Sequence, residues 1–136
     1  MKKTISLFSI VLLFSLGCAG VQRPTPEQLA NADYGSYPTN YKEITTQYIS
    51  NMLKDPYGAL FIEWRGPSKG WHGNDQGGFF GYRVCVFVST ENRMGGYNGR
   101  RLYFVVIKDG RVVVHDGGDY REGTLGEQRA YEICNF

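Results

Sequence analysis

Four short runs of apolar residues, separated by turn signals, cover the middle of the chain. β-Branched and aromatic residues dominate these runs, and such side chains fit the pleated, half-buried surface of a strand. The runs lie at residues 60–65, 79–88, 102–107 and 112–114. This pattern predicts four strands that follow one another as an antiparallel meander.

Asp109-Gly110 separates the last two runs and is a strong signal for a two-residue hairpin turn. Both faces of the predicted sheet are apolar at the centre, so each face needs a cover. The turn predicts a register in which Lys108 lies opposite Arg111, Ile107 opposite Val112, Val106 opposite Val113, and Phe104 opposite His115.

A helical period of apolar residues precedes the strands, from Tyr41 to Leu53. Asn40 is a favoured N-cap residue, Glu43 completes a capping-box pattern, and Pro56 is expected to end the helix. This helix can cover one face of the sheet, and the C-terminal piece 127–136 can cover the other. The predicted class is α+β: one N-terminal helix packed on a four-stranded antiparallel β-meander with a short C-terminal element.

Two stretches between the runs are expected to be loops. Residues 66–78 are rich in Gly, Pro, Ser and Asn, which predicts a long polar loop. Residues 92–99 form a glycine-rich connection in which Gly95, Gly96 and Gly99 should include positions with positive φ.

The N-terminus has the features of an export signal. Met1-Lys2-Lys3 is followed by an apolar stretch over 5–16, which is too short for a stable membrane-spanning helix. The stretch ends at Ser15-Leu16-Gly17-Cys18, which resembles the lipobox of bacterial lipoproteins. The resemblance implies cleavage before Cys18 and acylation of its thiol; an ordinary cleaved signal, in which Cys18 is incidental, is the alternative.

These features divide the chain into a lipoprotein signal peptide (1–17), a flexible tether (18–39) and a single α+β domain (40–136). The tether is expected because prolines and few large aliphatic residues occupy that range. Ala19 stands where an aspartate retains such lipoproteins at the inner membrane. The resemblance therefore implies the periplasmic face of the outer membrane, with the extracellular face left open.

The net charge excludes one class of binding partner, and the cysteine count predicts a disulfide. The net charge is +2, but removing 1–17 removes Lys2 and Lys3 and leaves 13 basic against 13 acidic residues. A nucleic-acid-binding protein needs a basic face, so we exclude that class. With Cys18 lipidated, Cys85 and Cys134 are an even pair in an oxidising compartment and predict a disulfide; two separate buried thiols are the alternative.

Two blocks carry a second resemblance: Leu53-Lys54-Asp55-Pro56, and Gly95-Gly96-Tyr97-x-Gly99. Together they resemble a widespread family of small uncharacterised bacterial exported proteins and lipoproteins. The resemblance covers about residues 41–114 and departs at Gly58 and at 89–91. It implies a shared domain and no particular chemistry.

Candidate catalytic groups are few. His115 neighbours Asp116 and Asp119, and His72 neighbours Asp75. This spacing predicts no metal site, and no hydrolase or cofactor signature is present in the sequence, so no cofactor and no catalytic residue is assigned. A small envelope hydrolase using His115 or His72 with a neighbouring Asp is the alternative function.

The glycine-rich loop is the candidate binding surface, although its glycines by themselves favour a structural role. Tyr and Arg are enriched in interfaces. We therefore expect a non-enzymatic cell-envelope lipoprotein, a binding or structural module held to the membrane by its lipid. Candidate partners are an envelope protein, peptidoglycan or a lipid headgroup. The candidate rim comprises Arg93, Gly95, Gly96, Tyr97, Asn98 and Arg100.

Overall fold

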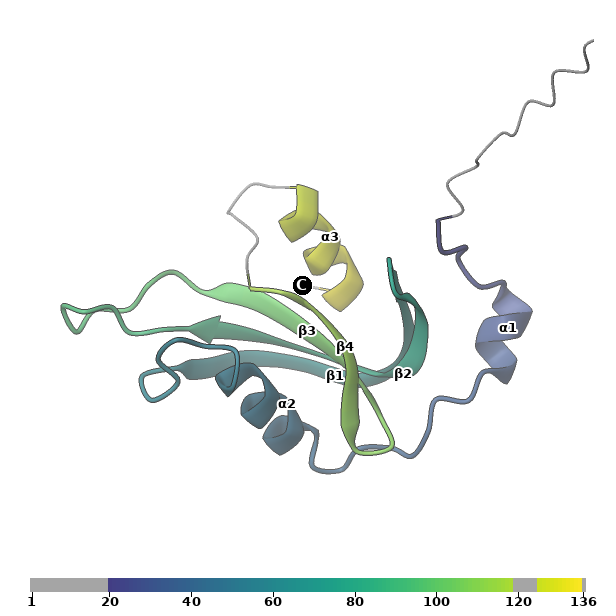
Figure 1. Ribbon diagram of the computed structural model, residues 1–136, viewed down its shortest axis with the longest axis horizontal. Coiled ribbons are helices and arrows are strands. Elements are labelled where there is room, and N and C mark those ends of the chain that lie inside the picture. The colour runs from purple at the N-terminus through teal and green to yellow at the C-terminus, as the bar shows by residue number, and fades with distance from the viewer. Residues whose placement is uncertain (1–19, 119–124, 136) are drawn as a thin grey trace, which may run out of the picture.

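The computed structural model describes residues 20–118 and 125–135, so the signal peptide, Cys18 and Asp119 lie outside the described residues. Four strands form one antiparallel sheet in the order β1-β2-β3-β4, which confirms the predicted α+β class and its four-stranded antiparallel sheet (Figure 1). The elements are α1 (Pro26–Asn31), α2 (Tyr41–Ser50), β1 (Leu60–Asn74), β2 (Gly77–Ser89), β3 (Arg101–Lys108), β4 (Arg111–Gly117) and α3 (Leu125–Cys134).

Helices lie on both faces of the sheet, with α2 on one side and α3 on the other (Figure 1). Side chains alternate between the faces along a strand, so β2 contributes to both cores. On the α2 side, Ile49 packs with Val86 and Val88. The α3 side holds a separate cluster of buried residues, namely Cys85, Phe87, Leu102, Phe104 and Cys134.

Within the α3-side cluster, a disulfide joins the sheet to α3. Cys85 of β2 and Cys134 at the end of α3 are bonded, with their Cα atoms 5.9 Å apart. The predicted cysteine pairing is therefore confirmed, and it ties the C-terminal helix to the second strand.

The prediction of a long loop over 66–78 is wrong, because β1 and β2 continue through this range as a hairpin that turns at Asp75 and Gln76. Two of the glycines here make room for an aromatic ring. A Cβ added at Gly73 or Gly78 would come within 2.7 Å or 2.6 Å of the Trp71 indole. These glycines allow close packing within a strand and do not mark a loop.

The predicted register of the last hairpin is correct at the turn and wrong beyond it. Asp109 and Gly110 both have positive φ, as a type I′ turn requires, and Lys108 and Ile107 have their predicted partners. The register then shifts by one residue, and an extra residue in one strand is a β-bulge. As a result Val106 lies opposite Val114, Phe104 opposite Asp116, and Val105 opposite His115.

Helix α2 begins after Asn40 as predicted, but the Asn40 side chain makes no capping hydrogen bond, so the expected capping box is absent. The helix also ends at Ser50, well before Pro56. The N–H groups of Met52 and Leu53 donate to Ile49 and Ser50, respectively, which tightens the chain into turns after the last helical residue.

The segment before α2 lies against the sheet. Helix α1 falls within the range expected to be a tether, and Thr25 and Gln28 form a capping box at its start. Tyr34 and Tyr37 make edge contacts with Phe80 and Tyr82 of β2. In the part of the chain that the structure describes, no helix is long and apolar enough to cross a membrane.

Candidate functional site

The glycine-rich loop joins β2 to β3, and every residue from 91 to 100 is exposed. Asn92 organises it: its N–H donates to the Gly96 carbonyl at 2.6 Å, and its Oδ1 accepts from the N–H groups of Met94 and Gly96. Gly95 has a φ of 78°, as expected for one of the three glycines, whereas Gly96 and Gly99 have no positive φ. The loop therefore has a defined shape.

Two further contacts fix the base of this loop. The hydroxyl of Ser89 donates to the Asn98 carbonyl at 2.6 Å. Arg100 pairs with Glu63 of β1, and its guanidinium lies 4.5 Å from the Phe87 ring centroid. Arg100, a predicted rim residue, thus already has partners within the fold, while Arg93 and Tyr97 stay exposed.

The connection between α2 and β1 lies beside the glycine-rich loop (Figure 1). A Cβ at Gly58 would come within 2.8 Å of the Glu91 Cβ, so the absence of a side chain lets the two segments meet. The side chains of Tyr57, Met94 and Tyr97 are 99%, 95% and 51% exposed. We call these three residues, together with the half-exposed Leu60 of β1, the loop-end surface.

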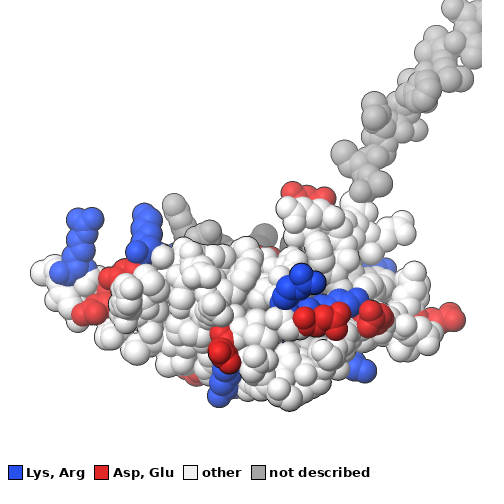
Figure 2. Space-filling model, turned by 60° about the horizontal axis from the view of Figure 1, so that its bottom comes forward, with Lys and Arg blue, Asp and Glu red and all other residues white. Residues whose placement is uncertain are grey.

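Three residues of the loop-end surface were not singled out from the sequence: Tyr57, Leu60 and Met94. Met94 lies inside the glycine-rich loop, whereas the only local signal for Tyr57 was an aromatic residue directly after Pro56. Figure 2 shows Lys and Arg side chains projecting at the left end of the molecule, the end that carries these loops in Figure 1, with Asp or Glu side chains beside them.

In the structure, His72 pairs with Asp116, the carboxylate that neighbours His115 in the sequence. Its Nε2 lies 3.6 Å from Oδ2 of Asp116, and its ring contacts Phe104 edge-on. Asp75 lies instead in the exposed turn of the β1–β2 hairpin. Burial is the main cause that lowers the pKa of His72; Asp116 opposes this effect and Arg83 adds to it.

His115 lies on the other face of the sheet, opposite Val105. It is exposed, and its Nδ1 is 2.8 Å from the hydroxyl of Tyr48 on α2. The two histidines therefore do not share a site. Across residues 20–118 and 125–135, no three His, Cys, Asp or Glu side chains come together as metal ligands would.

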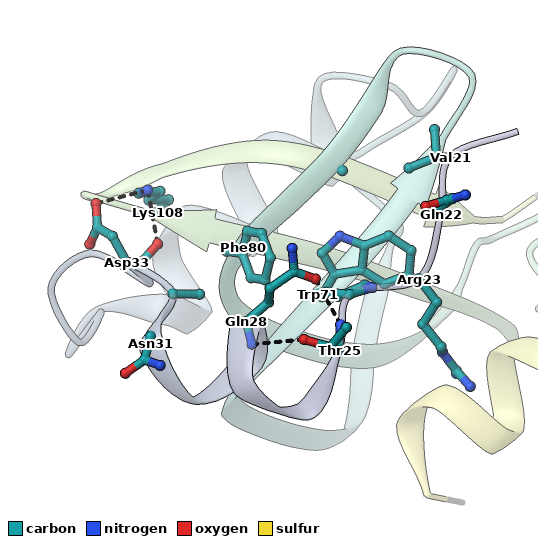
Figure 3. Close-up of a pocket in the computed structure, with 13 residues that line it drawn as sticks. Val21, Gln22, Arg23, Thr25, Gln28, Asn31, Asp33, Trp71, Phe80 and Lys108 are labelled. Atoms are coloured by element: carbon teal, nitrogen blue, oxygen red, sulfur yellow. Dashed lines mark hydrogen bonds and ion pairs between the residues drawn. The ribbon is translucent and has the colours of Figure 1, made fainter. Parts of the chain in front are cut away.

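A cleft of about 760 Å³ separates α1 and its flanking residues from the β1–β2 hairpin (Figure 3). Trp71 and Phe80 supply its aromatic wall, and polar side chains of the N-terminal segment line the other side. Lys108 closes one end by binding the Asp33 carboxylate at 3.0 Å and the Asp33 carbonyl at 2.9 Å. No local sequence pattern predicts this cleft, because it depends on how the N-terminal segment docks against the β1–β2 hairpin.

No protein family, curated protein or solved structure matches this chain. Its function is therefore inferred from the geometry described above.

Proposed function

We propose that the protein is a non-enzymatic cell-envelope lipoprotein, and that it is a binding module whose loop-end surface docks a partner protein. The observation that carries this proposal is the exposure of Tyr57, Met94 and Tyr97 on neighbouring loops. Large exposed apolar groups that cluster on a soluble domain mark interaction sites, and aromatic residues and Met are enriched there.

Order in the glycine-rich loop supports binding by a preformed surface. The hydrogen bonds of Asn92 and the Ser89–Asn98 contact hold the loop before any partner arrives. A preorganised surface loses less conformational entropy on association than a mobile one does. The exposed Arg93 adds a cation at the edge of this surface.

In this proposal the domain is a four-stranded antiparallel meander with one helix on each face of its sheet. Helix α2 is the predicted N-terminal helix, and α3 is the predicted short C-terminal element. The lipid at Cys18 holds the module at the periplasmic face of the outer membrane. Among the candidate partners we favour an envelope protein over peptidoglycan or a lipid headgroup, since the loop-end surface is mainly apolar and aromatic.

Site-specific photo-crosslinking in cells tests the proposal. A photo-reactive residue at Met94 should yield a discrete protein adduct, and one at the exposed Val113 of β4 should not. Tyr57→Ala and Tyr97→Ala should each weaken the Met94 adduct at unchanged melting temperature, since exposed substitutions change stability by only about 0.5 kcal/mol. Identical adducts at both positions, or adducts only to lipid or glycan, would contradict a protein partner at this surface.

The alternative, a small envelope hydrolase, is supported by one contact, His72 with Asp116. A carboxylate that orients a histidine is part of many hydrolytic sites. Such an enzyme would lose turnover of ester or peptide substrates in His72→Gln and keep it in His115→Gln.

A further inference from the structure

A small cavity of about 200 Å³ lies on the α3 side of the sheet, between β1, β2 and the end of α3. It is separate from the loop-end surface and from the cleft beside α1. Among the described residues that line it, two are arginines and none is an Asp or Glu. Its polar lining comes from Arg65, Ser68, Arg83 and Asn135.

Arg83 is the central group of this cavity. Alternation along β2 places it on the same face as Cys85, and it is half-buried there. Gly70 of the neighbouring strand makes room for it: a Cβ on Gly70 would come within 3.3 Å of the Arg83 Cζ. Gly70 has no positive φ, so the space for Arg83 accounts for this glycine better than backbone conformation does.

The Arg83 guanidinium has no hydrogen bond, ion pair or ring contact with any residue in the described ranges, although its charge lowers the pKa of the nearby His72. Burial lowers the pKa of Arg83 itself, which means that removal from water penalises its charge. A partly buried cation without a counter-charge costs stability. Its presence is therefore not explained by stabilisation of the fold.

We propose that this cavity is an oxyanion-binding site in which Arg83 binds the carboxylate or phosphate group of a small molecule. A guanidinium presents paired N–H donors that match two oxygens of such a group. The hydroxyl of Ser68 and the amide of Asn135, which line the same cavity, can donate to the remaining oxygens. The bound anion supplies a counter-charge that none of the described residues lining the cavity provides.

Titration of the purified full-length protein tests this site, with sodium acetate and inorganic phosphate as separate probes at constant ionic strength. Calorimetry or NMR should show saturable binding of at least one probe. Acetate alone would indicate a planar carboxylate ligand, and phosphate alone a phosphate ligand. Arg83→Gln should weaken binding at least tenfold, while Arg111→Gln, an exposed arginine on β4, should not. No saturable binding, or equal loss in both variants, would overturn the proposal.

A second measurement separates binding from folding. In the absence of added anion, Arg83→Gln should melt at the same temperature as the wild type or higher, because it removes a half-buried charge that has no partner among the described residues. A clear decrease, or failure to fold, would show that Arg83 is a structural group and would overturn the assignment. Added anion should raise the melting temperature of the wild type only.

Discussion

The surroundings of His72 link a single side chain to the stability of the whole fold. Burial lowers the pKa of His72 below its ordinary value of 6.5, and the Asp116 carboxylate only partly offsets this effect. Between the folded and unfolded pKa values, the unfolded chain binds more protons than the folded chain. The free energy of unfolding should therefore decrease as the pH falls below about 6.5 and level off below the folded pKa.

His72→Gln should remove this part of the pH dependence, because glutamine does not titrate. Asp116→Asn should instead extend the pH dependence. It removes the group that raises the pKa of His72, so the free energy of unfolding should go on decreasing down to lower pH values than in the wild type. Denaturant unfolding of the three proteins across about pH 5 to 7.5 measures both changes. Parallel stability curves for the wild type and His72→Gln would show that His72 is not the group responsible.

Individual residues also show what a sequence can and cannot specify. The glycine-rich loop was expected to need a positive φ, and Gly95 supplies it. Which glycine takes that role is decided by hydrogen bonds to Asn92, and Gly96 is itself one of the donors. His72 and Asp116 are 44 positions apart in the sequence. Proximity in the sequence therefore predicted the wrong carboxylate partner for His72, namely Asp75.

At the scale of the elements, the disulfide between β2 and α3 is a covalent constraint on the fold. It spans 49 positions of the chain. In the chain-entropy model, closing a loop of that size lowers the entropy of the unfolded state and is worth roughly 4 kcal/mol. The disulfide also holds α3 over the buried cluster that contains Phe87 and Phe104.

Cys85→Ser or Cys134→Ser should therefore lower the melting temperature markedly under oxidising conditions. Under reducing conditions each variant should match the reduced wild type closely, which provides the control. Thermal unfolding in the presence and absence of a reductant makes the comparison. If the oxidised wild type were no more stable than its serine variants, the bond would not contribute to stability.

The elements were predictable where side-chain pattern and local turn chemistry agree. The apolar runs identified all four strands, and Asp109-Gly110 identified the hairpin turn. Two features required information that a local pattern does not carry. Gly73 and Gly78 are explained by packing against Trp71, and the bulge near Val113 follows from pairing with β3.

At the scale of the whole molecule, the arrangement of the ends bears on how the protein would sit at a membrane. The described chain starts at Gly20 and leads directly to α1. Figure 1 places α1 at the opposite end of the sheet from the loops that carry the loop-end surface. A lipid at Cys18 would therefore leave the loop-end surface directed away from the anchor, where a partner protein can reach it.

None of the three candidate sites could be predicted as a unit, since each combines distant segments. The loop-end surface needs residues 57 and 97, the cleft needs the N-terminal segment and Lys108, and the Arg83 cavity needs the end of α3. Sequence reasoning identified individual members of these sites, such as Tyr97. It could not show which members meet, because that depends on sheet register and helix docking.

The lipid anchor is the remaining whole-molecule prediction. Mass spectrometry of the membrane fraction should find Cys18 as the N-terminal residue, with a diacylglyceryl group on its thiol and an acyl group on its amine. Because several acyl chains bind a bilayer far more firmly than one, the protein should resist extraction by salt and require detergent. Cys18→Ser should pass into the soluble fraction or keep its uncleaved leader, with the folded domain unchanged in melting temperature. An unmodified N-terminus beyond Cys18, or release of the wild type by salt alone, would contradict the anchor and leave an ordinary cleaved signal as the better description.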